Sequence, residues 1–139
     1  MRAIKNIRLR NYDYSSNGFY FVTICTDYRK PYLVGENKNV VARFIERLPE
    51  KINGVRLDYY QIMPTHFHLI LILENCKLKL SEIIRRLKAM VKKQIGFNLW
   101  QPNYHEHVIR NEEALTKIRK YIQDNPSVEK IELGRFYKK

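Results

Sequence analysis

The first part of the chain alternates between strand-like and helix-like patterns of apolar residues. Residues 19–26 are rich in aromatic and β-branched side chains, a composition typical of a strand. Over residues 38–48 the apolar positions recur at steps of three and four, which predicts one buried face of a helix. Pro49 follows, and because proline lacks a backbone N–H we expect the helix to end there. The pattern therefore predicts a strand followed by a helix.

Two further strands are predicted to pair as a hairpin. Residues 55–63 alternate between apolar and polar side chains, and residues 66–73 begin with two histidines and continue as an apolar run. Only Pro64 and Thr65 separate these segments, so the connection is tight enough for an antiparallel hairpin. The fixed φ of Pro64 makes the entry to the histidine strand rigid.

The chain continues with a second helix and a fourth strand. Apolar residues form one face over residues 81–95, with Ser81 as the predicted N-cap and Gly96 as the predicted stop. Residues 104–110 have the length and alternation of a strand. We therefore expect a second helix followed by a fourth strand.

A last helix is predicted to begin after Asn111, an N-cap residue, and to end before Pro126. The elements over residues 19–110 follow the order βαββαβ. This order is typical of an α+β, ferredoxin-like sandwich, in which an antiparallel sheet has helices packed on one face. The sequence therefore predicts that fold with an added C-terminal helix.

The length of 139 residues predicts one domain over residues 1–139, with a basic arm (1–17) and a tail (127–139) that shows no periodicity and that we expect to be partly disordered. No apolar run approaches the ~20 residues of a membrane span, and no secretory signal is visible. We therefore expect a cytoplasmic protein without a membrane partner. Cys25 and Cys76 lie in or beside apolar segments, which favours reduced, buried thiols.

The third predicted strand begins with His66 and His68. Successive side chains of a strand alternate between faces, so these two imidazoles point the same way and Phe67 points the other way. Histidine is the commonest metal ligand, and the pair offers two nitrogens to one ion. The alternative is a pair of half-buried polar residues with ordinary hydrogen bonds.

Two imidazoles rarely complete a divalent site, so a third ligand is expected elsewhere in the chain. Asn125 offers a carbonyl oxygen, and imidazole with amide suits Mg²⁺ or Mn²⁺ better than a thiolate-loving ion. Tyr121 lies one helical turn before Asn125, so both share a helix face. A phenol oxygen beside a metal-bound phosphate would be a nucleophile.

The formal net charge of +12 favours a partner with phosphate groups. Half of this excess lies between residues 77 and 93, where seven cations accompany one acid, and the first ten residues add four cations and no acid. Clustering of this kind favours nucleic acid over an anionic membrane, because the cationic part of the helix carries no aromatic anchor. The candidate nucleic-acid-binding residues are Arg2, Arg8, Arg10, Arg85, Arg86, Lys88, Lys92, Lys93 and Lys117.

Three segments carry a resemblance to a known family. They are Met-Pro-Thr-His-Phe-His-Leu-Ile at 63–70, Tyr-His-Glu-His-Val-Ile-Arg at 104–110 and Tyr-Ile-Gln-Asp-Asn-Pro at 121–126. Their order and spacing resemble the single-tyrosine transposases of the His-hydrophobic-His superfamily. The Asn-Pro after the tyrosine helix is most similar to the branch called REP-associated tyrosine transposases. The resemblance covers roughly residues 12–126 and implies a ferredoxin-like fold.

The resemblance also implies roles for the residues. His66, His68 and Asn125 match the metal ligands, and Tyr121 matches the nucleophile. The implied activity is Mg²⁺- or Mn²⁺-dependent cleavage and rejoining of single-stranded DNA through a 5′-phosphotyrosine link, at sites beside DNA hairpins. Tyr104 is the strongest rival nucleophile because it precedes His105 and His107, yet the family places the nucleophile on the last helix.

Two questions stay open at the level of sequence. One is whether the protein is instead a non-catalytic hairpin DNA- or RNA-binding module on the same fold, although no RNA-binding aromatic strand motif is visible. The other is oligomeric state, because members of the family act as homodimers or as monomers. Lys117 and Lys120 beside Tyr121, as well as the metal, are candidates for activating the phenol.

Overall fold

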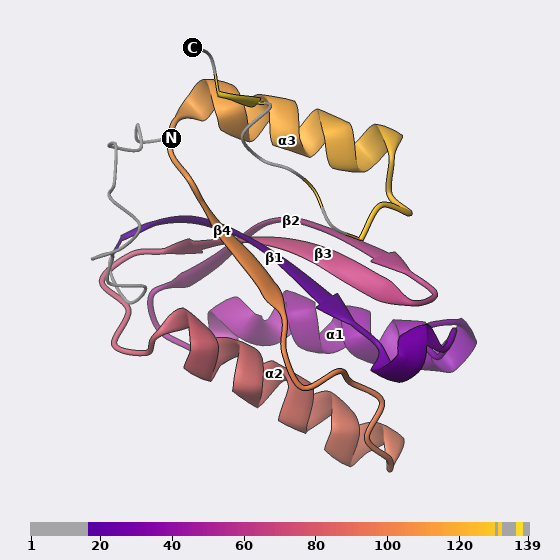
Figure 1. Cartoon of the computed structure of the whole chain (residues 1–139). Coiled ribbons are helices and arrows are strands. Elements are labelled where there is room, and N and C mark those ends of the chain that lie inside the picture. Colours follow the sequence, from indigo (N-terminus) through magenta and orange to yellow (C-terminus); the bar gives the residue numbers. More distant parts are fainter. Residues whose placement is uncertain (1–16, 130, 132–135, 138–139) are drawn as a thin grey trace.

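The computed structural model describes residues 17–129, 131, 136 and 137 (Figure 1). The elements are β1 (Gly18–Cys25), the short 3-10 turn η2 (Asp27–Arg29), α1 (Gly35–Lys51), β2 (Val55–Met63), β3 (His66–Leu73), α2 (Leu80–Ile95), β4 (His105–Ile109) and α3 (Glu112–Asp124). This order confirms the predicted βαββαβ pattern with a C-terminal helix. Residues Arg2, Arg8 and Arg10 of the predicted arm lie outside the described residues.

The four strands form one antiparallel sheet in the order β2-β3-β1-β4. The predicted hairpin is confirmed, since Met63 at the end of β2 lies opposite His66 at the start of β3. One feature of β2 was not predicted, a register shift between Leu57 and Tyr59 that marks a bulge. The ferredoxin-like sandwich expected from the sequence is therefore the observed fold.

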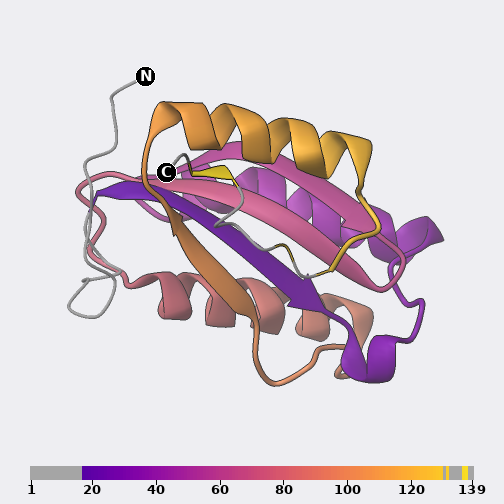
Figure 2. The same ribbon diagram turned by 45° about the horizontal axis from the view of Figure 1, so that its top comes forward.

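The sheet has one face covered by α1 and α2 and the other covered by α3 (Figures 1 and 2). Because strand side chains alternate, each face has its own core. The core under α1 and α2 contains Val22, Ile24, Phe67, Leu69, Leu71, Ile45, Leu48, Ile84 and Leu87. The core under α3 contains Phe19, Phe21, Ile70, Leu115, Ile118 and Ile122.

The bounds of the first helix differ from the prediction. α1 begins at Gly35 and continues through Pro49 to Lys51. Pro49 lies in the last turn, and the backbone N–H of Ile52 still donates to the Leu48 carbonyl at 2.9 Å. The proline therefore does not end the helix, because a missing N–H near the end removes only one bond of the ladder.

The second helix begins one residue earlier than its predicted cap. Lys79 is the N-cap of α2 and makes no side-chain cap bond, so the prediction of Ser81 as the N-cap is wrong. Leu80 is fully buried, and its packing places the first turn before the serine. The other end is as predicted, since Gly96 adopts a φ of +101° that suits glycine.

The third helix begins as predicted. The side chain of Asn111 accepts a hydrogen bond from the backbone N–H of Ala114 at 2.7 Å. The described part of the tail also packs on the fold, because Ile131 and Phe136 are buried in the core under α3. None of the helices in residues 17–129 has the length and apolarity of a membrane span.

Candidate active site

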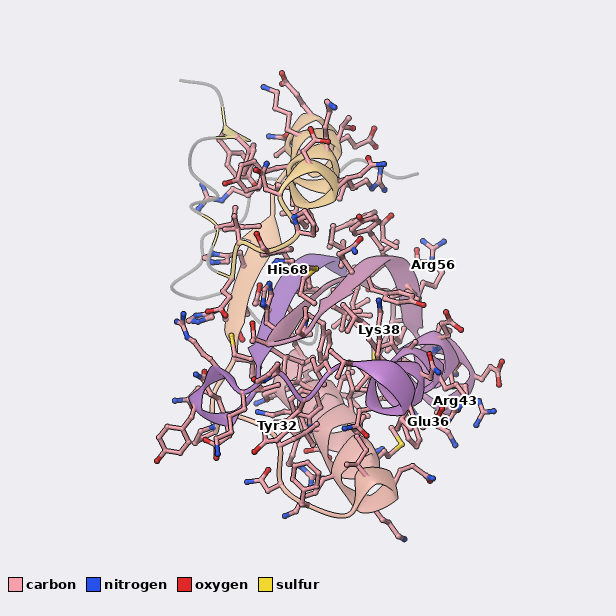
Figure 3. All side chains as sticks on the ribbon, turned by 90° about the vertical axis from the view of Figure 1, so that its right-hand side faces the viewer. Tyr32, Glu36, Lys38, Arg43, Arg56 and His68 are labelled. Atoms are coloured by element: carbon pink, nitrogen blue, oxygen red, sulfur yellow. The ribbon has the colours of Figure 1, made fainter. Side chains whose placement is uncertain are left out.

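The register of the sheet brings both histidines to the face covered by α3. His68 lies opposite Thr23 of β1, and His66 lies opposite Cys25. Figure 3 shows His68 at the level of the sheet. The exposed fractions of His66 and His68 are 1% and 0%, so both imidazoles are removed from solvent. The prediction that they share one face is confirmed.

The His68 imidazole has one partnered and one unpartnered nitrogen. Its Nδ1 lies 2.9 Å from the Thr23 hydroxyl oxygen, whereas its Nε2 is buried and has no hydrogen-bond partner among the described residues. Burial, followed by the neighbouring His66, lowers the pKa of His68 to about 4. The ring is therefore neutral at physiological pH, although backbone contacts from Val128 and Pro126 act in the opposite direction and raise its pKa. When Nδ1–H donates to Thr23, Nε2 is the unprotonated nitrogen.

The His66 imidazole is held by the segment that follows α3. Its Nε2 lies 3.1 Å from the Pro126 carbonyl oxygen, and because a carbonyl only accepts, Nε2–H is the donor. Its Nδ1 lies 3.1 Å from the Thr65 hydroxyl oxygen and 3.6 Å from Oε2 of Glu129. Burial is the largest cause of a lowered pKa for His66. The two histidine rings are 4.9 Å apart between centroids.

Asn125 is exposed at the end of α3, next in sequence to the residue that contacts His66. Asn125 is the C-cap, and its backbone N–H and its side-chain Nδ2 both donate to the Tyr121 carbonyl, at 2.8 and 3.2 Å. The next residue is Pro126, whose carbonyl contacts His66. Segments about 60 residues apart in the sequence therefore meet where β3 begins and α3 ends.

The candidate nucleophile Tyr121 packs on the same side of the sheet. Its half-buried ring meets Phe136 edge-on, with centroids 5.4 Å apart, in the core under α3. Tyr104 instead packs against the core under α1 and α2. The sheet therefore separates the rival tyrosine from the histidine face, and it keeps Tyr121 on that face. His107 is stacked near Phe21 at 6.4 Å between ring centroids.

The residues fit a divalent metal only in part. A buried imidazole nitrogen without a partner is unusual, since buried polar atoms are nearly always hydrogen-bonded, and His68 Nε2 is such an atom. No group of three or more His, Cys, Asp or Glu side chains that could hold a metal occurs in the described part of the chain. Any further ligand must therefore be of another kind, as the amide of Asn125 is.

The basic helix α2 lies on the opposite face of the sheet from the histidines (Figure 1). Arg85 and Arg86 both bond to the Glu82 carboxylate, with nitrogen–oxygen distances of 2.6 and 2.9 Å. Their guanidinium groups lower the pKa of Glu82 to about 2. The two arginines also line a groove of about 630 Å³ between α1 and α2, together with Lys51, Ile52, Ala89 and Met90.

The remaining predicted cations differ in their surroundings. Lys88 is half-buried, and its Nζ donates to the Gln101 carbonyl at 2.7 Å, so it joins α2 to the segment before β4. Lys92 and Lys93 are exposed in the last turn of α2. Lys117 pairs with Glu113 at 3.3 Å on the exposed side of α3.

The pattern of apolar and polar residues in the sequence did not predict that Glu129 and its partners lie beside His66. Oε2 of Glu129 accepts from the Thr65 hydroxyl at 3.1 Å, and Oε1 lies 2.8 Å from a guanidinium nitrogen of Arg29, without the alignment of a hydrogen bond. Thr23 was likewise not identified. Alternation along the strand shows that Thr23 shares a face with Phe19 and Phe21, but no local signal places it opposite His68. Glu129 was missed because the tail that contains it has no periodicity.

Comparison with known proteins agrees with these observations. The family model described as "Transposase IS200 like" matches residues 14–125. The chain is 34% identical to an uncharacterized protein of Haemophilus influenzae, over an alignment of 157 residues that covers 88% of this chain and 87% of the relative.

Two solved structures share the fold. A REP-associated tyrosine transposase bound to a REP hairpin superposes with a TM-score of 0.73 at 25% identity, over 88% of this chain and 73% of that one. A protein of Deinococcus radiodurans assigned as a candidate transposase superposes with a TM-score of 0.59 at 23% identity, over 86% and 97% of the two chains. The chain belongs to the IS200-like transposases, the family of single-tyrosine, His-hydrophobic-His proteins in which the REP-associated tyrosine transposases are found.

Proposed function

We propose that this transposase cleaves and rejoins single-stranded DNA through Tyr121. The phenol loses its proton as its oxygen attacks the phosphorus, the bond from phosphorus to the 3′ oxygen of the preceding nucleotide breaks, and that 3′ oxygen takes up a proton. The products are a 5′-phosphotyrosine link and a free 3′-OH, and the reverse attack of a 3′-OH rejoins the strand. The observation that carries the proposal is the buried histidine pair beside the end of the helix that bears Tyr121, where His66 contacts the Pro126 carbonyl and Nε2 of His68 makes no aligned hydrogen bond.

The metal ligands in this proposal are His66, His68 and Asn125. Mg²⁺ or Mn²⁺ bound there supplies Lewis-acid stabilisation of the charge on the phosphate oxygens. The protein contributes neutral imidazoles, because burial lowers the pKa values of both histidines. Thr23 orients the His68 ring through the contact at Nδ1.

The proposed substrate is single-stranded DNA beside a hairpin. One structural relative was solved with a REP hairpin, and the cations of α2 offer contacts to a phosphate backbone. Arg85, Arg86, Lys92 and Lys93 remain the candidates on this helix, whereas Lys88 has a structural partner. Binding through these residues should weaken steeply as salt increases, because counterions are released from DNA on binding. The arm residues and Lys117 stay candidates as predicted.

The test is formation of a covalent adduct. The protein is incubated with hairpin DNA that has a labelled single-stranded flank, in Mg²⁺ or Mn²⁺, and separated under denaturing conditions. We expect an adduct that is absent with Tyr121→Phe and present with the matched variant Tyr104→Phe. An adduct lost in Tyr104→Phe and kept in Tyr121→Phe would overturn the assignment of the nucleophile. Tight binding without an adduct in either metal would favour the non-catalytic module.

A further inference from the structure

The loop after β1 exposes an aromatic ring to solvent. The exposed fraction of Tyr28 is 83%, the largest of the exposed large hydrophobic residues in the described part of the chain. The other two, Val34 and Phe97, are 51% and 42% exposed, and Phe97 contacts Tyr32 edge-on. Tyr28 therefore presents more of its ring to solvent than either of them.

The backbone of this loop is strained at the same place. Tyr28 has a φ of +52° and Arg29 a φ of +55°, both in the left-handed region that side chains other than glycine rarely adopt. Such conformations persist only when the surroundings determine them, and they concentrate at functional sites. A glycine at position 28 would adopt this conformation without strain, so the tyrosine is not explained by the turn.

The surroundings hold the loop firmly. The Thr26 hydroxyl lies within hydrogen-bond distance of the carbonyls of Lys30 and Thr65, at 2.7 and 3.1 Å. The backbone N–H of Thr26 donates to the Thr65 carbonyl, and that of Asp27 donates to the Leu99 carbonyl, both at 2.9 Å. The loop is therefore fixed to two other segments of the chain, and Tyr28 extends from a rigid base.

One of these segments is the entry to the histidine strand. Thr65 precedes His66, and the ion pair between Arg29 and Glu129 joins the loop to the carboxylate that lies 3.6 Å from Nδ1 of His66. Arg29 still has 67% of its side chain exposed, so it can face a phosphate while paired. The loop thus forms a rim of the histidine site that carries one exposed ring and one exposed cation.

We propose that Tyr28 is a stacking platform for an unpaired base that flanks the cleaved phosphate, and that Arg29 beside it contacts the phosphate backbone of the DNA. The inference rests on the proposed function and adds a contact that positions the single strand. A planar ring stacks on any base, whereas a charged neighbour contacts the phosphate chain. A single ring between charged residues offers too little apolar surface for a protein interface.

Binding is measured separately from cleavage to test this proposal. All variants are made in the Tyr121→Phe protein, and affinity is measured by fluorescence anisotropy for a hairpin DNA with a single-stranded flank. Affinity is also measured for a set of DNAs that each lack one base of the single-stranded flank. We expect Tyr28→Ala to weaken binding about tenfold, the usual effect of losing one stacked base. Tyr28→Phe should bind as the parent does.

The stacked base is identified by non-additivity. At one abasic position, loss of the base should weaken binding of the parent protein about as much as Tyr28→Ala weakens binding of the intact DNA. On that abasic DNA, Tyr28→Ala should cause no further loss of affinity. Phe97→Ala is the matched control, an exposed aromatic residue that should leave affinity unchanged on every DNA. The proposal is overturned if Tyr28→Ala binds the intact DNA as tightly as the parent, or if its loss is the same at every abasic position.

A further variant separates stacking from a structural role. Tyr28→Gly relieves the positive φ and removes an exposed ring, so its melting temperature should equal or exceed that of the parent. Its affinity should nonetheless fall as in Tyr28→Ala. A lower melting temperature together with unchanged affinity would show that the ring serves the loop and not DNA. The adduct test of Tyr121 is independent of these results, because binding is read without chemistry.

Discussion

The two faces of the sheet differ in what they bury. The core under α1 and α2 consists mainly of aliphatic and aromatic side chains, whereas the face under α3 also holds Thr23, His66 and His68, three of the four buried polar residues in the described part of the chain. The fourth, Thr26, bonds to backbone carbonyls at the end of β1. Both faces are built from the same strands, so their difference comes from alternate positions of one sequence.

This difference separates stability from chemistry. Burying an imidazole nitrogen without a partner costs free energy, and no partner is present for His68 Nε2 in the described residues. The apolar face has no such cost, and it contributes the larger cluster of buried side chains. We therefore expect substitutions on the face under α1 and α2 to change folding, and substitutions around the histidines to change activity.

The largest effect is expected from His68→Leu. Cleavage should fall at least about 10³-fold, equal to ~4 kcal/mol of transition-state stabilisation, because a metal ligand is lost. The melting temperature should not fall, since an apolar side chain replaces a buried polar group of similar size. Cleavage rates and thermal unfolding of the same preparation check both statements. Retained cleavage would show that His68 is only a core residue.

The next effect lies on the other face. Leu87 of α2 is fully buried, and Leu87→Ala should lower the free energy of unfolding by ~2–5 kcal/mol through the lost contacts and the cavity. The cleavage rate per folded molecule should be unchanged. Ile118→Ala, on α3, is the matched variant, because it should destabilise the fold and also slow cleavage by loosening the helix that carries Tyr121. Equal cleavage in both variants would contradict the separation of the two faces.

Acid should destabilise the fold through the histidine face. The pKa of His68 is about 4 in the folded chain against 6.5 for the free side chain, so the unfolded chain takes up a proton first as the pH falls. Stability from this residue is complete above pH 6.5 and is lost toward pH 4, on the order of 3 kcal/mol. Denaturant titrations at several pH values measure it. His68→Leu should flatten the curve, and superimposable curves would refute the assignment.

A smaller effect is expected at the contact that fixes α3 on the sheet. Asp58, at the bulge of β2, forms a bidentate ion pair with Arg119 of α3, and their side chains are 10% and 34% exposed. Asp58→Asn should cost about 1–2 kcal/mol of unfolding free energy and reduce cleavage, since Tyr121 follows two residues later.

The matched control for Asp58 is an exposed ion pair of the same helix. Lys120 and Asp124 are 75% and 54% exposed, so Asp124→Asn should change stability by less than about 0.5 kcal/mol. Chemical denaturation of both variants makes the comparison. If the two substitutions have equal effects, the Asp58–Arg119 pair does not hold α3 on the sheet.

Local patterns were sufficient for most of the fold. The order of elements, the hairpin, the cap at Asn111 and the stop at Gly96 follow from residues a few positions apart, and the structure confirms them. The errors have tertiary causes. Helix α2 begins at Leu80, before Ser81, because Leu80 is buried in the core. Helix α1 continues through Pro49 because a proline in the last turn removes only one hydrogen bond.

The candidate site divides in the same way. That His66 and His68 share a face is determined by the sequence alone, because alternation along a strand is local. Which element covers that face depends on long-range packing. Only the tertiary structure separated Tyr121 from Tyr104, with the sheet between their cores. It also placed the cations of α2 on the far face from the histidines.

The surroundings of the histidine pair are likewise a tertiary outcome. Arg29, Thr65 and Glu129 come from a loop, a turn and the tail, and no periodicity links positions so far apart. Their convergence follows from the antiparallel pairing of β1 with β3 and from the return of the chain after α3. The sequence by itself determined the elements and the direction of their side chains, and packing alone decided which of those side chains meet.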